Sequence, residues 1–417
     1  MKVAVIGAGI SGLAAAHVLA RAHEVTVFEA GAKPGGHTNT VRVDTEHETH
    51  WVDTGFIVFN DRNYPNFERL LGGLGVAGQP SNMSFSVTDQ TGDFEYASTS
   101  ANGLFAKRAH LATPWFLKMV ADVRRFQNEA RELLTTTGTD DGPSLGDWLQ
   151  ERRYSRPFID KLIVPQASAV WSADPKQMWT FPARFLAEFF HNHGMLTFTD
   201  RPKWRTVVGG SHRYVDAITA PLGDRLRLDT PVTAVRRHDD HVAVTPRGGE
   251  AERFDEVVLA THSDQALAML EDPSDREHQL LGAIAYQPNQ AVLHTDERML
   301  PRRRRAWASW NYHLLDAPKA QTTVTYHMNR LQSLIADREF CVTLNRSEEI
   351  DPAKVIETID YSHPVFTREG HAAQARHHEI SGTNRTYYAG AYWGWGFHED
   401  GVVSALKVTE AMGAGRL

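Results

Sequence analysis

The hydrophobic pattern at the start of the chain changes from that of a strand to that of a helix. Val3 to Ile6 is a short apolar run of the kind found in buried parallel strands, whereas residues 11–22 are rich in Ala and Leu, which is typical of a helix. A second β-branched run, 24–29, follows at once, and glycines separate the first strand from the helix. The opening of the chain therefore predicts a strand–helix–strand unit and a doubly wound α/β fold.

The middle of the chain follows a different pattern. Pro65 opens a predicted helix that should stop near Gly72-Gly73, and Thr113-Pro114 opens a longer helix with an apolar stripe. From about 79 to 204 the chain is helical and aromatic, as an inserted domain would be. Further on, strand patterns are found at 225–235, in a hairpin of 241–246 and 253–260, in the alternating stretch 283–345, which favours an antiparallel sheet, and at 386–391.

Composition narrows the class of protein. The chain has 417 residues, 41% of them hydrophobic, and a formal net charge of −7, which predicts a globular protein of more than one domain and argues against a nucleic-acid partner. Its single cysteine, Cys341, excludes an intrachain disulfide and a dithiol redox pair. The uncharged run 3–20 is similar to a signal peptide, but its glycines place it in the strand–helix unit. We therefore expect a cytoplasmic protein.

The turn between the first strand and the helix carries a dinucleotide-binding pattern. Gly7 permits the tight turn, Gly9 lets a pyrophosphate approach the backbone, and Gly12 lets helix and strand pack closely. The helix N-terminus offers free N–H groups to phosphates, and Glu29, at the end of the second strand, can accept from ribose hydroxyls, which disfavours NADP. The residues predicted to bind a cofactor here are Gly7, Gly9, Ile10, Ser11, Gly12 and Glu29.

A second candidate cofactor segment follows. The doublet Gly35-Gly36 and the later Asp53-Thr54-Gly55 resemble the second signature of the flavin amine-oxidase and phytoene-desaturase superfamily. That superfamily usually places arginines around the doublet; Lys33 and His37 stand there instead and should keep some positive charge near the pyrophosphate. The resemblance implies FAD as the cofactor, with Gly35, Gly36, His37, Asp53 and Gly55 beside it.

Later segments match the superfamily in the same order. Val232 lies in a stretch that resembles the strand whose main chain meets the adenine, and 254–261 resembles the strand pair after it. The closing segment, where backbone groups approach the flavin, is represented by Gly390, Asp400, Gly401 and Val402. Because Cys341 lies outside these segments, the resemblance implies FAD that is held without a covalent bond.

These segments place the cofactor-binding chain at both ends and in the middle of the sequence. We therefore expect a Rossmann-like FAD-binding domain interleaved with an α+β substrate domain, as in the amine-oxidase fold. The FAD-binding domain is predicted to comprise 1–78, 205–270 and 380–417, and the substrate domain 79–204 and 271–379.

A narrower resemblance points to a class of substrate. Several short stretches are similar to the oxidase-like N-terminal region of plant cyclopropane fatty-acyl synthases and to its stand-alone bacterial relatives, namely 35–37, 56–60, 64–66, 83–85, 171–172 and 396–401. The resemblance implies a lipid acyl chain as substrate.

One dinucleotide pattern is present, so no second site for NADPH is expected, and electrons should enter as hydride from a substrate C–H bond. We expect an FAD-dependent oxidoreductase that oxidises or desaturates an apolar, fatty-acyl substrate. Amine oxidation is the alternative, but the stretch 289–294 lacks the lysine that many of the superfamily's amine oxidases carry there. A flavin isomerase without net redox, and a flavin-bearing partner of a lipid methyltransferase, remain open.

Polar and aromatic residues near the end of the chain are the candidates for the reaction site. His398 and Glu399 are predicted to be the polar groups nearest the flavin and are the candidate catalytic residues. His191 and His193 have no third ligand beside them in the sequence, so no metal site is predicted. The residues predicted to line the substrate pocket are Trp171, His191, Tyr392, Trp395 and Phe397.

A run of four arginines, Arg302 to Arg305, is flanked by Trp307 and Trp310. Arginines beside aromatic residues are typical of proteins that dock on anionic membrane surfaces, with the rings at headgroup depth. We therefore expect peripheral membrane contact at this run; the alternative is an ordinary solvated charge run.

Overall fold

A computed structural model describes residues 1–417 except 136–141, 172–173, 198, 200 and 318. Within those residues, a five-stranded parallel sheet has the order β10-β2-β1-β14-β20. Its strands come from widely separated parts of the sequence: β1 (Lys2–Ile6), β2 (Glu24–Phe28), β10 (Leu226–Arg227), β14 (Glu256–Leu259) and β20 (Thr386–Tyr388). Val5 lies between Val27 and Val258, and all three are fully buried, as expected for a parallel sheet covered on both faces.

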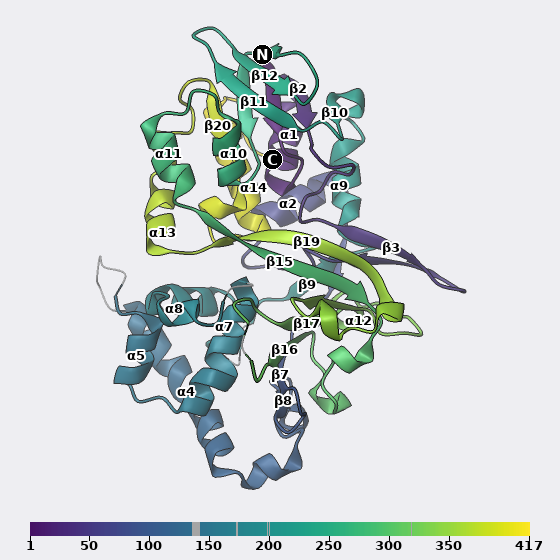
Figure 1. The fold of residues 1–417 in the computed structure, drawn as a ribbon, viewed down its shortest axis with the longest axis vertical. Coiled ribbons are helices and arrows are strands. Elements are labelled where there is room, and N and C mark those ends of the chain that lie inside the picture. Colours follow the sequence, from purple (N-terminus) through teal and green to yellow (C-terminus); the bar gives the residue numbers. More distant parts are fainter. Residues whose placement is uncertain (136–141, 172–173, 198, 200, 318) are drawn as a thin grey trace.

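Helices cover this main sheet (Figure 1). On one face α1 (Ile10–Leu19) packs on α14 (His398–Ala411), and α2 (Pro65–Leu74) and α9 (His212–Thr219) lie beside them. On the other face lie α10 (Ser263–Met269), α11 (Asp275–Gly282) and α13 (Arg368–Ala375), together with a small sheet of β11 (Val232–Arg237), β12 (Val242–Pro246) and β13 (Glu252–Phe254).

A mixed sheet forms the next layer. In the part of the chain that the structure describes it has seven strands, in the order β19-β15-β18-β17-β16-β7-β8, with every neighbouring pair antiparallel except β7 and β16. The strands are β7 (Phe85–Asp89), β8 (Glu95–Ala97), β15 (Ala285–His294), β16 (Trp310–Leu314), β17 (Val324–His327), β18 (Cys341–Leu344) and β19 (Val355–Val365), and α12 (Met328–Leu331) follows β17. The antiparallel sheet predicted from 283–345 is present.

A group of helices packs at one side of this sheet (Figure 1). They are α3 (Ala101–Leu104), α4 (Pro114–Thr135), α5 (Leu145–Glu151), α6 (Arg156–Phe158), α7 (Val164–Trp171) and α8 (Ala183–Asn192). Their buried side chains form a core of their own that is rich in aromatic residues, with Phe116, Phe158 and Phe190 almost fully buried. This is the helical, aromatic stretch that the sequence predicted.

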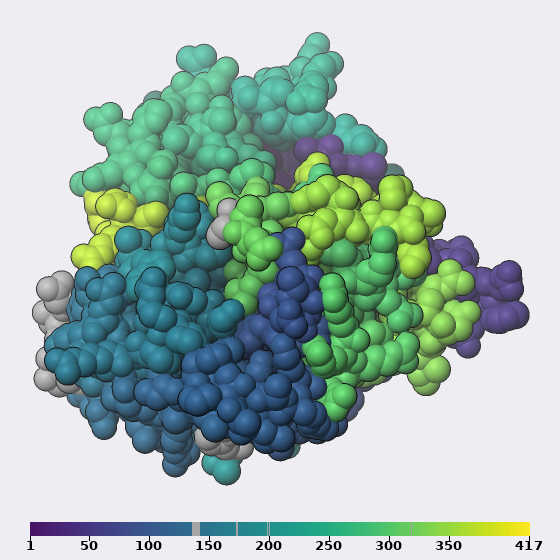
Figure 2. Space-filling model, turned by 60° about the horizontal axis from the view of Figure 1, so that its bottom comes forward, coloured from purple at the N-terminus to yellow at the C-terminus, as the bar shows by residue number. Residues whose placement is uncertain are grey.

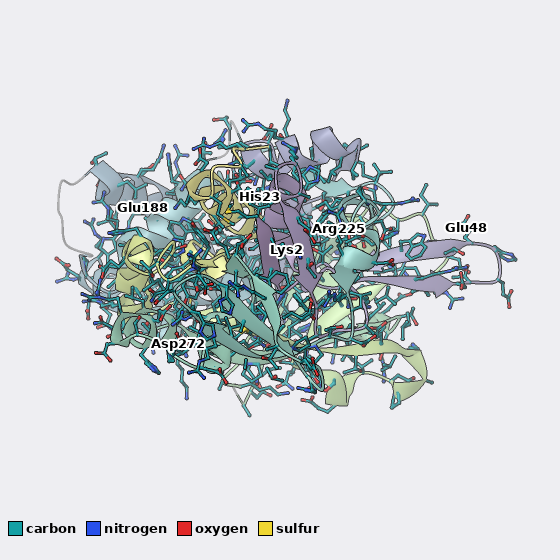
Figure 3. The ribbon with its side chains drawn as sticks, turned by 90° about the horizontal axis from the view of Figure 1, so that it is seen from above. Lys2, His23, Glu48, Glu188, Arg225 and Asp272 are labelled. Carbon is teal, nitrogen blue, oxygen red and sulfur yellow. The ribbon has the colours of Figure 1, made fainter. Side chains whose placement is uncertain are left out.

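Two smaller groups of strands complete the fold. The hairpin of β3 (Thr40–Asp44) and β4 (Thr49–Asp53) projects from the body of the protein, with Glu48 at its outer end (Figure 3). A short sheet of β5 (Phe59–Asn60), β9 (Trp204–Val207) and β6 (Gly78–Pro80) joins the main-sheet side of the chain to the helical group.

Local sequence signals account for several element ends. Pro65 begins α2 as predicted, and the helix ends at Gly75, whose φ of +68° is favourable for glycine. The hydroxyl of Ser144 accepts from the Asp147 N–H at 3.1 Å and caps α5. The predicted hairpin is only partly correct, because the chain after β13 leaves β12 and enters the main sheet as β14.

The mixed α/β fold that the sequence predicted is therefore confirmed. The division into two interleaved domains stays a prediction, and α11 and α13, which it assigns to the substrate domain, pack against the main sheet. None of the helices in the described residues combines the length and the apolar character needed to cross a membrane.

Candidate functional site

A deep cavity of about 1620 Å³ runs from the carboxyl ends of the main-sheet strands to the helical group. Ligand sites in proteins usually measure roughly 300–1,000 Å³, so this cavity has room for a dinucleotide and a substrate together. The turn after β1 and the loops after β2 and β14 line one end, which we call the nucleotide end; β7, β16, α4, α7 and α8 line the other, the substrate end.

The β1–α1 turn forms the floor of the nucleotide end. Gly7 has a φ of +102°, and a Cβ on Gly12 would lie 1.9 Å from the Gly7 carbonyl oxygen. A Cβ on Gly9, in contrast, would meet no atom within 4 Å, because Gly9 faces the open cavity. Gly7, Gly9, Ile10 and Ser11 line the cavity, whereas Gly12 supports the turn from behind. The first turn of α1 therefore presents backbone N–H groups to a bound phosphate.

Glu29 is held in place by the same turn. Its carboxylate accepts from the Ala8 N–H and from the Gly31 N–H, each at 2.8 Å. These bonds fix the carboxylate at the carboxyl end of β2, and it lines the cavity. An oriented acid at this point can accept from the hydroxyls of a ribose.

The second glycine segment closes over the first. Gly35 and Gly36 have φ values of +120° and +57°, and the Gly35 N–H donates to the Ala8 carbonyl at 2.8 Å. A Cβ on Gly36 would lie 3.2 Å from the Cα of Gly9, and one on Gly55 would lie 2.1 Å from the His37 carbonyl oxygen. Val232 and Gly390 also line this end. The glycines thus leave a cradle of backbone that side chains would fill, and this cradle fits FAD.

A cluster of neutral imidazoles lies beside the doublet. The His37 ring stacks on Tyr361 at 4.9 Å and lies 5.2 Å from His363 and 6.1 Å from His262. Burial, with help from the two neighbouring histidines, lowers the pKa of His37 to about 3, and burial lowers that of His363 to about 4. His37 therefore carries no positive charge near neutral pH, contrary to the expectation from sequence, and Lys33 is exposed outside the cavity. The other three members of this cluster were not predicted from the sequence, because no recognisable motif surrounds His262, Tyr361 or His363.

His398 lines the cavity but is engaged by the protein. Its ring stacks on Phe56 at 3.5 Å, and its Nε2 lies 2.9 Å from the Thr38 hydroxyl and 3.0 Å from the Tyr214 hydroxyl, which also bond to each other. Burial holds the pKa of His398 well below its usual value, so the ring is neutral. These contacts connect α14 to the segment after the glycine doublet, and the catalytic role of His398 stays a prediction.

The structure places Glu399, a predicted catalytic residue, against the start of α2. Its Oε1 accepts from the backbone N–H and the side-chain amide of Asn66 at 3.1 and 2.7 Å, and its Oε2 accepts from the Phe67 N–H at 2.9 Å. Both oxygens therefore cap the N-terminus of α2, and Glu399 faces a small neighbouring cavity of about 280 Å³.

Four residues predicted to bind the cofactor support the cradle without lining it: Asp53, Asp400, Gly401 and Val402. The buried carboxylate of Asp53 accepts from Ser211 and Gln332, and burial raises its pKa to about 7. Asp400 accepts from the Phe397 N–H at 2.9 Å and so caps α14, and burial raises its pKa to about 6. A Cβ on Gly401 would lie 2.8 Å from the Ile10 side chain, so this glycine lets α14 pack on α1.

Aromatic rings wall the substrate end. Trp171, Tyr392, Trp395 and Phe397 line it as predicted from sequence. His191 does not, because it is exposed at the end of α8 on the side away from the cavity. His193 takes that place: its ring stacks on Phe189 at 3.9 Å, and its Nδ1 lies 2.9 Å from the Phe189 carbonyl oxygen. The i, i+4 spacing of Phe189 and His193 in the sequence is the signal that would have pointed to His193.

Apolar side chains make up much of the substrate end. One face of α4 contributes Met119, Val120 and Val123, and the sheet contributes Phe85 and Trp310. Among the described residues that line the whole cavity there is no lysine, and the only carboxylate is Glu29, at the nucleotide end. Polar side chains also line this end, namely Arg124 and Gln127 of α4 and Gln166 of α7, but it offers no acidic partner for a cation.

The arginine run is not arranged as predicted. Trp307 is buried and its Nε1 donates to the Pro301 carbonyl at 2.6 Å, while Trp310 lies in β16 and lines the cavity. Arg303 donates to the buried Glu95 at 2.8 Å. Neither tryptophan can reach a headgroup layer from these positions, so the run lacks the aromatic anchors that the prediction required.

The parallel sheet, the glycine cradle and the oriented acid define a dinucleotide-binding protein of the Rossmann type. Comparison with known proteins gives the family: the model of flavin-containing amine oxidoreductases matches residues 10–331, and the chain belongs to that family. A protein named as a flavin-containing monoamine oxidase in Mycobacterium tuberculosis is 28% identical over 304 residues, which span 67% of this chain and 61% of that relative.

Solved structures share the fold at low sequence identity. Putrescine oxidase bound to putrescine has a TM-score of 0.70 at 16% identity, with 99% of each chain covered. A fatty acid isomerase from P. acnes that produces CLA has a TM-score of 0.67 at 15% identity, with 98% of this chain and 97% of that chain covered. One fold therefore carries different chemistries, and it does not decide between them.

Proposed function

We propose that this protein is an FAD-dependent oxidoreductase that takes hydride from a C–H bond of an apolar, acyl-chain substrate. The observation that carries the proposal is the substrate end of the cavity, which is lined mainly by apolar and aromatic side chains, with a few polar ones, and within the described residues holds neither a lysine nor a carboxylate. Family membership supports the redox part of the proposal, and the lining supports the class of substrate.

The reaction divides between the cofactor and the chain. FAD, when bound, would supply the acceptor for a hydride, and the proton from the adjacent carbon would pass to solvent as the double bond forms. The two electrons then pass to dioxygen or to an electron carrier. The chain's own contribution is to bind the dinucleotide at the glycine cradle, to hold the acyl chain among α4 and the aromatic walls, and to exclude water.

An acyl chain gains more from this lining than a cation does. Each methylene removed from water contributes about 0.8 kcal/mol, so even a part of a long chain is bound strongly. A protonated amine in the same place would lose its hydration without an acidic partner, which costs several kcal/mol. The lining thus favours a neutral, extended hydrocarbon.

Amine oxidation is the second candidate. The relative from Mycobacterium tuberculosis carries the name of a monoamine oxidase, and the solved structure of putrescine oxidase has this fold. The stacked rings of Trp395 on Phe185, at 3.9 Å, and of Phe397 on Phe189, at 5.5 Å, could flank a neutral amine. The charged form of an amine finds no counterpart in the lining.

The sequence resemblance to the oxidase-like region of plant cyclopropane fatty-acyl synthases supports an acyl substrate within this proposal. It also keeps two variants of it open, a flavin isomerase without net redox and a flavin-bearing partner of a lipid methyltransferase. We further propose that the FAD-binding part combines residues 1–78, 205–270 and 380–417; that the five strands of the main sheet all fall within these segments supports the division.

The experiment is anaerobic mixing of the FAD-loaded protein with a fatty acid, the phospholipid that carries it, and the fatty amine of the same chain length. Loss of the oxidised flavin absorbance together with a new carbon–carbon double bond supports the proposal. Reduction by the fatty amine alone, with an aldehyde as product, refutes the acyl-chain proposal in favour of amine oxidation. A shifted double bond without lasting flavin reduction identifies an isomerase.

A further inference from the structure

An exposed apolar surface lies at the beginning of α4. We define the α4 tip as residues 104–118, which include α3's last residue, the short 3-10 helix Arg108–Ala112 and the first turn of α4. Three large apolar side chains of the tip are exposed: Leu111 by 56%, Trp115 by 40% and Leu117 by 43%. The tip contains Lys107, Arg108 and Lys118 but no acidic residue, although the whole chain carries a net charge of −7.

The packing of the tip explains why these side chains point outward. Phe116 is fully buried, and the His110 ring stacks on it at 4.2 Å. The Trp115 ring lies 5.8 Å from both Phe94 and Phe116 and 5.9 Å from His110, yet 40% of the residue stays exposed. The core of the helical group is therefore filled without the side chains of Leu111, Trp115 and Leu117. Their exposure to water is unfavourable unless another apolar phase covers them.

The charges of the tip favour an anionic partner. Arg108 donates to the Asn102 amide oxygen and to the Phe105 carbonyl, both uncharged groups. Lys107 pairs with the exposed Asp93 and Lys118 with the buried Asp122, so these two cations are partly compensated. The tip as a whole thus combines apolar side chains with a positive charge, which is the combination that anionic lipid surfaces bind.

The tip also borders exposed residues that line the cavity, and we call this part of the lining the cavity mouth. Exposed residues just before it in the chain, Ser98, Thr99 and Ser100, line the cavity, and so do Leu104 within it and Val120 just after it. In Figure 1 the short helices before α4 form the lower end of the molecule, and Figure 2, with that end turned forward, shows the blue atoms of this part of the chain at the surface. A surface that meets the tip therefore meets the cavity mouth.

We propose that the α4 tip docks on anionic lipid bilayers and aligns the cavity mouth with them, so that an acyl chain passes from the bilayer into the substrate end. The acyl substrate in this inference rests on the proposed function, whereas the docking surface rests on the side chains of the α4 tip. Leu111, Trp115 and Leu117 enter the headgroup and upper acyl region, and Lys107, Arg108 and Lys118 lie at the level of the phosphates. This proposal places the membrane contact at the α4 tip instead of at the arginine run 302–305.

The test is flotation of the full-length, FAD-loaded protein with vesicles of phosphatidylcholine alone or with added phosphatidylglycerol, at low and high salt. The parent protein should float with the anionic vesicles and lose much of that binding at high salt. The variant L111S/W115S/L117S should lower the partition coefficient by roughly tenfold or more. The variant K107S/R108S should lower it by roughly thirtyfold on anionic vesicles at low salt and leave binding to neutral vesicles unchanged.

The matched control variants remove side chains of the same kinds, apolar or basic, elsewhere on the surface. The variant I335S removes an apolar side chain that is 89% exposed, and R304S/R305S removes two neighbouring arginines from the other basic run. Both should float as the parent does. Flavin absorbance and the melting temperature, compared across all variants, show that each is folded.

The inference is overturned if the parent ignores anionic vesicles at low salt, if the tip variants float as the parent does, or if R304S/R305S abolishes binding. Its failure is distinguishable from that of the proposed function. Flavin reduction by a detergent-solubilised acyl substrate without vesicle binding refutes the docking inference alone. Vesicle binding that depends on the tip, without flavin reduction by any acyl substrate, supports docking and refutes the proposed function.

Discussion

Gly9 and Gly12 belong to one motif but meet different surroundings. A Cβ at Gly12 would overlap the Gly7 carbonyl, whereas a Cβ at Gly9 would enter the open cavity. The two substitutions should therefore fail in different ways. The glycine motif states which residue types are needed, and the structure shows which of them touch the cofactor and which only let helix and strand approach.

We expect Gly12→Ala to destabilise the apoprotein by about 3 kcal/mol, because the strand and helix must move apart. Gly9→Val should leave the melting temperature of the apoprotein unchanged and prevent FAD from binding, because the side chain occupies the cofactor's space. Thermal unfolding of the apoproteins and titration with FAD measure the two effects. Equal losses of stability in both variants would contradict this assignment.

Glu399 provides a test of structural against catalytic roles. Replacing it by Ala leaves the N–H groups of Asn66 and Phe67 without their acceptor. We expect the free energy of unfolding to fall by about 1–2 kcal/mol, as for the loss of other helix caps, while the rate constant of anaerobic flavin reduction stays as in the parent. Urea unfolding and rapid-mixing absorbance measure the two quantities. A large fall in the rate constant with unchanged stability would support the catalytic role instead.

At the scale of helices and strands, the sequence predicted those features that depend on interactions between residues close together in the chain. The strand–turn–helix at 1–29, the helix opened by Pro65 and the cap at Ser144 all depend on neighbours in the chain. The role of Glu399 could not be predicted, because its partners on α2 are more than three hundred residues away in sequence. The histidine cluster around His37 escaped detection for the same reason: β19, which carries His363, meets the glycine doublet only in the folded protein.

The face of α4 that lines the cavity should set the length of chain that is accepted. Val123→Trp places a large ring in the substrate end, and we expect flavin reduction by long acyl chains to slow by at least roughly tenfold, while short chains are affected little. Val208→Trp, at an exposed position, is the matched control. Rate constants for a series of chain lengths measure the effect. Equal slowing at every length would show that α4 does not contact the chain.

At the scale of the whole molecule, buried histidines set the response to acid. Burial lowers the pKa values of His193, His294, His363 and His377 to about 4 and that of His37 to about 3, and those of His313 and His398 also lie well below the usual value. Two buried acids oppose them, since the pKa values of Asp53 and Asp400 are raised to about 7 and about 6. The histidines are the more numerous group.

Below pH 6.5 the unfolded chain binds protons at these histidines that the folded chain does not. Their contribution to stability is therefore complete above pH 6.5 and is lost as the pH falls toward 4, at about 1.4 kcal/mol per pH unit for each proton taken up. We expect the urea midpoint to be lower at pH 5 than at pH 7. A midpoint that is equal or higher at pH 5 would show that the buried acids dominate.

The central claim is that the protein holds an acyl hydrocarbon against FAD and that a hydrogen of one of its C–H bonds is transferred as hydride to the flavin. The most direct measurement is the rate of anaerobic flavin reduction by a fatty-acyl substrate compared with its perdeuterated form, with the product's double bond located in the same sample. We expect the flavin to be reduced, deuteration of the substrate to slow this reduction several-fold, and a new double bond to form in the product. No reduction by any acyl chain, with rapid reduction by simple amines, would contradict it.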